Sequence, residues 1–145
     1  MKLLYAEDEP TMAEAVVDIL TYHNYLVDAV SDGEDALSYA LSETYDGIIL
    51  DPPSYGRGTN GEMWKLEDSI CDLMNMCTEV LSDNPLFIVL NSYTTGLSSS
   101  VMTYLLQMTV GRKYKIRVDS QEIGLPVEQT GLAVPAGNTA VVYFD

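Results

Sequence analysis

The stretch YDGIILDPPSYGRGTNGEMW, residues 45–64, changes character at one aspartate. Residues 45–51 form a short apolar run that ends in Asp51, and such a run predicts a buried β-strand. Residues 52–61 are rich in proline and glycine, which predicts a loop. Asp51 is therefore expected at the carboxyl end of a strand, where α/β sheets place their chemistry.

On both sides of this stretch, short apolar strands alternate with amphipathic helices. Parallel strands need a crossover helix between them, so the alternation predicts an α/β fold: a single doubly wound, three-layer sheet of the Rossmann or flavodoxin-like kind. No helix separates the last two strands, and we therefore expect the final strand to run antiparallel. The strands are expected at residues 2–6, 25–30, 45–51, 85–91, 113–123 and 139–144, the helices at 9–23, 31–43, 64–82 and 97–110, and a loop at 124–137.

The length and composition are those of one domain. The chain has 145 residues, of which 47% are hydrophobic, enough for a core of its own. No apolar run approaches the length that spans a bilayer, and Met1 leads into a charged residue and a short strand rather than an apolar leader. We therefore expect one domain, residues 1–145, in a cytoplasmic protein that does not bind membranes.

The net charge of −15 is unevenly distributed. Residues 1–51 hold 12 of the 22 acidic residues and only one of the 7 basic residues. Nucleic-acid binding depends on basic surface, so the composition predicts no nucleic-acid partner. The basic run Arg112, Lys113, Lys115 and Arg117 alternates with apolar residues, which favours an edge strand that lysines protect over an RNA-binding patch. Exposed edge strands remain a route to a homo-oligomer.

Acidic side chains gather where the first and third strands are predicted to end. Glu7 and Asp8 follow the first strand, and Asp51 ends the third. If these strands are neighbours, the carboxylates could hold Mg²⁺ together with water molecules. The alternative, that they are solvated loop residues of an acidic protein, remains open at this point.

The first third of the chain resembles a known family. KLLYAEDEP, YLVDAVSDGEDAL and YDGIILD together resemble the first half of a bacterial response-regulator receiver domain, over residues 1–51. The resemblance implies that Glu7 and Asp8 hold Mg²⁺, that the carbonyl group of Pro53 completes the metal site, and that Asp51 is phosphorylated. Beyond Asp51 the family's switch residues are not matched: Asn91 and Ser92 lie nearest its Thr or Ser, and the last strand contains no lysine.

The remainder resembles a second family. DPPSYGRG, GEMWKLEDS, LFIVLNSYTTGLS and EIGLPVEQTGLAVPAGNTA make residues 46–145 similar to the C-terminal part of class I, RNA-type S-adenosylmethionine (SAM)-dependent methyltransferases. In that family the Asp-Pro-Pro loop borders the cofactor and substrate pocket. The family holds its cofactor by a glycine-rich turn after the first strand and an acidic residue ending the second. Here that turn is AEDEP, without glycine, and Asp28 is the acid of the second strand.

The two resemblances meet at Asp51 and predict a chimera: a single hybrid domain with a receiver-like half, 1–51, and a methyltransferase-like half, 52–145. The expected sheet order is 2-1-3-4-6-5. From the divided sites we expect an engineered or recombined scaffold with no evolved activity, not an enzyme, with no catalytic residue, no required cofactor and no natural partner. The alternative is a Mg²⁺-binding, phosphorylatable receiver pocket, and a SAM-dependent methyltransferase is the least favoured interpretation.

Overall fold

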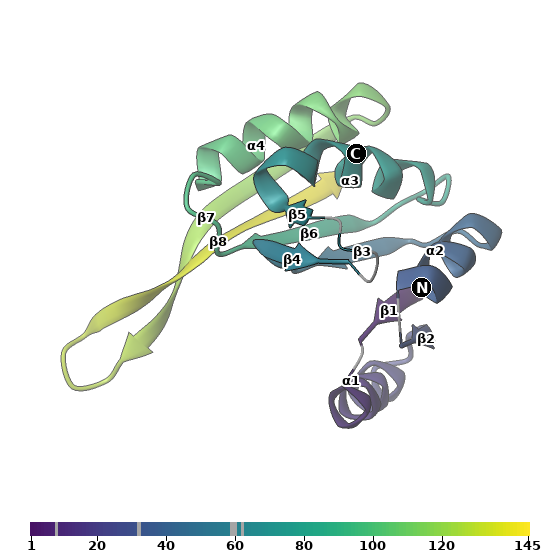
Figure 1. Ribbon diagram of the computed structural model, residues 1–145, viewed down its shortest axis with the longest axis horizontal. Helices are drawn as coiled ribbons and strands as arrows, with labels where there is room; N and C mark the ends of the chain where they lie inside the picture. Colours follow the sequence, from purple (N-terminus) through teal and green to yellow (C-terminus); the bar gives the residue numbers. More distant parts are fainter. Residues whose placement is uncertain (8, 32, 59–60, 62) are drawn as a thin grey trace. The chain divides into compact units, whose positions relative to one another are not determined.

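The computed structural model describes residues 1–7, 9–31, 33–58, 61 and 63–145, and these form a mixed α/β fold (Figure 1). The described elements, in chain order, are β1 (Lys2–Ala6), α1 (Pro10–Tyr22), β2 (Leu26–Val30), α2 (Gly33–Ser42), β3 (Gly47–Leu50), β4 (Tyr55–Arg57), β5 (Met63–Lys65), α3 (Leu66–Glu79), β6 (Phe87–Ser92), α4 (Ser99–Met108), the 3-10 turn η1 (Val110–Arg112), β7 (Ile116–Val127) and β8 (Leu132–Phe144). Within this part of the chain, no helix is both long and apolar enough to cross a membrane.

The chain divides into two compact units. Unit 1 consists of Met1–Ile48 and Glu79–Leu86, and unit 2 of Ile49–Thr78 and Phe87–Asp145. Unit 1 contains 13 acidic residues and one basic residue, whereas unit 2 contains 9 acidic and 6 basic residues. The negative charge of the protein is therefore concentrated in unit 1. The single hybrid domain with halves 1–51 and 52–145 stays a prediction.

Unit 1 is built on a parallel pair of strands. β1 and β2 pair from Lys2↔Leu26 to Ala6↔Val30, with α1 as the crossover that a parallel pair requires. Pro10 begins α1, where its missing N–H costs nothing, and Glu9 caps the helix. The largest buried side chain in this unit is that of Tyr45, which lies just before β3.

Unit 2 contains the larger hydrophobic core. Its four-stranded sheet has the order β3-β6-β8-β7, and β8 runs antiparallel to both β6 and β7. The predicted antiparallel direction of the final strand is confirmed. Most of the buried apolar side chains of this unit come from α3, β6, α4 and β8: Leu66, Ile70, Met74, Ile88, Leu90, Met102, Leu105, Leu106, Ala140 and Val142.

The prediction of a loop at residues 124–137 is wrong, because β7 and β8 continue into this segment. Their ladder extends to Val127↔Leu132, and Gly131, with φ +69°, closes the turn in a conformation that glycine adopts without strain. Figure 1 shows this hairpin running past the end of β6, whose ladder with β8 stops at Ser92↔Asn138. Proline and glycine in the sequence suggested a loop, but the local pairing of two adjacent segments overrides that preference.

The prediction of a single sheet in the order 2-1-3-4-6-5 is also wrong. The described residues form three sheets, β1-β2, β3-β6-β8-β7 and β4-β5. The sheet β1-β2 matches the expected neighbours 2-1, and β3-β6-β8-β7 matches the expected run 3-4-6-5. No ladder between β1 and β3 is recorded among the described residues. At the start of β1 the Lys2 amide donates to the Asp46 side-chain Oδ2 over 3.1 Å instead of to a strand carbonyl. The Asp46 amide donates to the Lys2 carbonyl oxygen over 3.3 Å, so Asp46 engages both backbone groups of Lys2.

Candidate functional site

The loop that follows β3 is held in a defined conformation within unit 2. The indole Nε1 of Trp64 donates to the Pro53 carbonyl oxygen over 2.8 Å, and the Leu66 amide donates to the Ser54 carbonyl oxygen over 3.1 Å. Within the segment 52–61, which the sequence predicted to be loop, Tyr55–Arg57 form β4 and pair with β5, placing Tyr55 opposite Lys65. The Asp-Pro-Pro loop is therefore anchored by the chain that returns to it.

A second loop, after β6, meets the first through side chains. The Thr94 hydroxyl donates to the Ser54 hydroxyl over 2.7 Å, and the Thr94 amide donates to the Ser92 hydroxyl over 3.1 Å. Ser92 and Thr94 are both buried. Buried hydroxyl groups are stable only when they are hydrogen-bonded, so this short chain of bonds fixes the relative position of the two loops.

Gly137 allows β8 to pass close to the second loop. Its φ is +109°, and a Cβ atom at this position would lie 2.6 Å from the Ser92 carbonyl oxygen. Only glycine adopts this backbone conformation readily and leaves room for the neighbouring carbonyl. The sequence PAG at residues 135–137 thus has a packing role beside the loops.

A pocket of ≈ 440 Å³ lies between these loops and the β5–α3 junction. Its mouth carries two exposed tyrosine rings, and its other side chains offer hydroxyl groups, one ammonium group and one carboxylate. The lining residues are Ser54, Tyr55, Lys65, Glu67, Tyr93, Thr94 and Thr95. A pocket with aromatic walls and a few polar groups is suited to a small molecule.

The metal-site residues predicted from the sequence fall in different parts of the structure. Glu7 belongs to unit 1, Asp51 and Pro53 belong to unit 2, and Asp8 lies outside the described residues. Among the described side chains, no group of three or more His, Cys, Asp or Glu residues could hold a metal ion. The Pro53 carbonyl oxygen already accepts a hydrogen bond from Trp64. The Mg²⁺ site and the phosphorylation of Asp51 stay predictions.

Between β1 and α1, the carboxylates of Glu7 and Glu9 accept hydrogen bonds from nearby backbone amides. The Glu9 carboxylate accepts hydrogen bonds from the amides of Met12, over 2.6 Å, and Thr11, over 3.2 Å. These two bonds hold the pKa of Glu9 below its ordinary value. The Glu9 amide in turn donates to the carboxylate of Glu7. The amides at the start of α1, a common place for an anionic ligand group, are therefore capped by a carboxylate of the protein.

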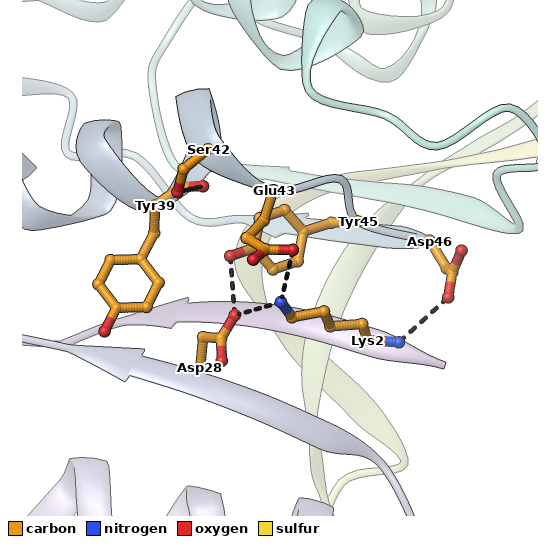
Figure 2. Close-up of polar contacts among 7 residues, drawn as sticks. All are labelled: Lys2, Asp28, Tyr39, Ser42, Glu43, Tyr45 and Asp46. Atoms are coloured by element: carbon orange, nitrogen blue, oxygen red, sulfur yellow. Dashed lines mark hydrogen bonds and ion pairs between the residues drawn. The ribbon is translucent and has the colours of Figure 1, made fainter.

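The acidic residue of β2 is also engaged (Figure 2). Lys2 Nζ lies 3.0 Å from Asp28 Oδ2 and 3.1 Å from Glu43 Oε2, and the Tyr45 hydroxyl donates to Asp28 Oδ2 over 3.0 Å. Burial, followed by the hydrogen bond to Asp28, raises the pKa of Tyr45 to about 12. Lys2 is the single lysine or arginine of unit 1, and both Asp28 and Glu43 form ion pairs with it.

These contacts decide whether the chain can hold SAM in the way that the resemblance implies. The turn after β1 presents carboxylates in place of glycines, and Asp28 is paired with Lys2 and Tyr45. The described residues of unit 1 therefore do not fit that mode of cofactor binding. No reaction step through the cofactor follows from them.

Sequence reasoning missed most of the pocket. The lining residues Ser54, Lys65, Glu67 and Thr94 nevertheless lie inside the motifs that carry the methyltransferase resemblance. That coincidence was the signal that could have identified them.

Comparison with known proteins supports the two-part character of the chain. No family model matches it. The transcriptional regulatory protein DltR of Streptococcus agalactiae is 45% identical over 51 residues, 35% of this chain and 23% of that protein. The response regulator ArlR of Staphylococcus aureus is 48% identical over 50 residues, 34% of this chain and 23% of that protein. The chain thus spans less than a quarter of the length of these relatives.

The solved structures that resemble the chain do so over its whole length. A SAM-dependent methyltransferase from Agrobacterium tumefaciens superimposes with a TM-score of 0.66 at 21% identity, over 97% of this chain and 48% of that one. SMU.776, described as a methyltransferase and solved in complex with SAH, gives 0.67 at 20% identity, over 100% of this chain and 39% of that one. The fold is Rossmann-like, and receiver-like sequence over about a third of a methyltransferase fold fits a chimera.

These neighbours correct the functional expectation. A scaffold with no evolved activity, and not an enzyme, was expected from the divided sites. The expectation is wrong, because the structures that match the full length of the chain are SAM-dependent methyltransferases. An engineered origin has no support in these comparisons.

Proposed function

We propose that the chain is the acceptor-binding part of a SAM-dependent methyltransferase and that the pocket beside the Asp-Pro-Pro loop binds the molecule that receives the methyl group. The observation that carries the proposal is the Thr94–Ser54 hydrogen bond, which joins the loops after β3 and β6 at the mouth of the pocket. The carboxyl ends of strands are where α/β sheets bind their ligands.

The chain covers less than half of each of the two methyltransferases described above, so the activity of a whole enzyme belongs to this proposal. The residues of unit 1 do not fit the cofactor, which leaves acceptor binding as the role that the geometry supports. The pocket has room for a small planar molecule between its loops.

Ligand-detected nuclear magnetic resonance with a panel of small planar compounds tests the proposal. We expect members of the panel to bind the parent chain and to lose binding in Tyr93→Ser, because Tyr93 lines the pocket. The control is Tyr104→Ser, which removes an exposed tyrosine of α4 that does not line the pocket. Equal binding to the parent and to Tyr93→Ser, or no binding to the parent, contradicts the proposal.

Calorimetry with SAM and SAH addresses the donor side separately. We expect no binding near micromolar concentrations, because Glu9 caps α1 and Asp28 is paired. Tight binding of either compound would show that the interpretation of the β1–α1 turn is wrong, without affecting the acceptor pocket.

A second candidate function rests on the sequence alone. Identity of 45 to 48% with regulators over 50 or 51 residues favours a receiver-type phosphorylation of Asp51 with Mg²⁺ held by Glu7, Asp8 and the Pro53 carbonyl. Incubation with acetyl phosphate followed by intact mass measurement tests it. An unchanged mass would count against this candidate.

A further inference from the structure

The pocket offers several hydroxyl groups, and each of them can donate as well as accept a hydrogen bond. Because the Thr94 hydroxyl donates its proton to Ser54 Oγ, the Ser54 hydroxyl keeps its own proton for a different acceptor. Within the described part of the chain, no acceptor for that proton is recorded. Thr95 adds another hydroxyl group, and Tyr93 adds its exposed phenol ring. A ligand that accepts hydrogen bonds matches this set of groups.

Lys65 adds a positive charge to the same wall. It lies opposite Tyr55 in the β4–β5 ladder, and cross-strand partners point to the same face. Arg57, two residues after Tyr55, shares that face by the alternation of a strand. In the ranges that the structure describes, Lys65 forms no ion pair. The β4–β5 hairpin therefore presents two cationic side chains on the face that borders the pocket.

Glu67 and the charge of the whole protein limit how much negative charge a ligand can carry. Glu67 lines the same pocket, and its carboxylate repels a second anion close to it. The protein carries −15 overall, so a polyanion such as RNA is repelled at long range. Lys65 offsets the charge of Glu67 within the pocket, so a ligand with a single negative charge meets less repulsion than a polyanion.

We propose that the pocket binds a small aromatic monocarboxylate, with its carboxylate on the Lys65 ammonium group and the Ser54 hydroxyl and its ring against Tyr93. This inference rests on the proposed acceptor site and names the chemical class of the acceptor. It distinguishes the chain from a nucleic-acid-modifying enzyme, whose substrate is a polyanion.

The test compares benzoate with benzamide, which has nearly the same shape and no charge. Dissociation constants for the intact chain are measured by ligand-detected nuclear magnetic resonance at low salt. We expect benzoate to bind about tenfold more tightly than benzamide, because a charged acceptor strengthens its hydrogen bonds. We also expect added potassium chloride to weaken benzoate binding and leave benzamide unchanged.

Substitutions at two lysines test whether Lys65 causes the tighter binding of benzoate. Lys65→Met keeps the aliphatic stem and should reduce benzoate to the affinity of benzamide. Lys115→Met is the matched control, because Lys115 is an exposed lysine of unit 2 that does not line the pocket, and it should leave benzoate binding unchanged. Lys65→Gln provides a second substitution if the methionine variant unfolds, as judged by circular dichroism.

Equal affinity of the parent for benzoate and benzamide, or unchanged benzoate binding in Lys65→Met and Lys65→Gln, overturns the inference. If both compounds bind equally and both lose binding in Tyr93→Ser, the acceptor pocket stands and only the charge preference fails. If neither benzoate nor benzamide binds up to about 10 mM, the proposed ligand class, a small aromatic carboxylate, is wrong as well. Tighter binding of transfer RNA than of benzoate would overturn the inference and indicate a nucleic acid as the acceptor.

Discussion

The hydroxyl of Thr94 donates a 2.7 Å hydrogen bond to the hydroxyl of Ser54, 40 residues earlier in the chain. Ser54 follows the Asp-Pro-Pro loop after β3, and Thr94 follows β6. Thr94 is buried whereas Ser54 is exposed, so water competes with this bond from the Ser54 side only. The bond therefore couples the shape of the pocket to the stability of unit 2.

Removing the Thr94–Ser54 hydrogen bond should disturb the shape of the pocket and lower the stability of unit 2. Thr94→Val keeps the side-chain volume but removes the hydroxyl, and we expect the free energy of unfolding to fall by about 0.5 to 1.5 kcal/mol, because exposed Ser54 can bond water instead. Urea unfolding followed by circular dichroism measures the change. Thr44→Val is the control, because Thr44 is exposed. A stability loss of the same size in both variants would contradict the role assigned to Thr94.

Tyr45 should make the protein sensitive to alkaline pH. Burial, followed by the Asp28 hydrogen bond, raises its pKa from the ordinary value of 10.0 to about 12. A raised pKa in the folded state means that the stability contribution is complete below pH 10 and is lost as the pH rises to about 12, because the unfolded chain releases the proton first.

The variant Tyr45→Phe cannot ionise at this position. We expect the stability difference between the parent and Tyr45→Phe to shrink as the pH rises above about 10. Urea unfolding across this range measures the difference, with Tyr22→Phe, which removes an exposed phenol, as the control. A difference that stays constant with pH would show that Tyr45 does not titrate as proposed.

The two cysteines should differ strongly in reactivity. Cys71 is exposed, whereas burial raises the pKa of the Cys77 thiol to about 11. Only the thiolate reacts with a disulfide reagent, so at pH 8 Cys77 should react at least about tenfold more slowly than Cys71. The single variants Cys71→Ser and Cys77→Ser assign the slow and fast phases. Equal rates in the folded protein would be inconsistent with the partial burial of Cys77, whereas equal rates in urea are expected.

The receiver-like sequence predicts a response to Mg²⁺. A ligand that binds only the folded state raises the melting temperature by mass action, with about 2.7 kcal/mol gained at a hundredfold excess over the dissociation constant. We expect Mg²⁺ to raise the melting temperature of the parent and not that of Asp51→Asn. Asp83→Asn, at an exposed acidic residue, is the control. The same gain in all three proteins would indicate non-specific binding rather than a site at Asp51.

Local pattern was sufficient for most of the elements. Apolar runs and helical periodicity predicted β1, β2, β3, β6 and the four helices near their observed positions, because each depends on residues close together in the sequence. The two-part resemblance, with its change at Asp51, was also readable from short motifs. The direction of β8 followed from the missing helix between the last two strands.

Pairing between distant segments was less predictable. The β7–β8 hairpin continues through a segment rich in proline and glycine, and β4 forms within a predicted loop, because in both cases a neighbouring strand supplies hydrogen-bond partners. The hydrogen bonds between Asp46 and Lys2, 44 residues apart, likewise join distant segments. Sequence periodicity carries no information on such contacts.

The sequence by itself determined the class of fold, the uneven charge and the position of the Asp-Pro-Pro loop, since these follow from composition and local order. Only the tertiary structure decided which loops meet. Ser54, Lys65 and Thr94 form one pocket because β3, β5 and β6 end near one another, and the contacts between them are non-local. The commitment of Asp28 to Lys2 and Tyr45 was likewise visible only once the strands were paired, because a carboxylate's partners are set by what packs against it.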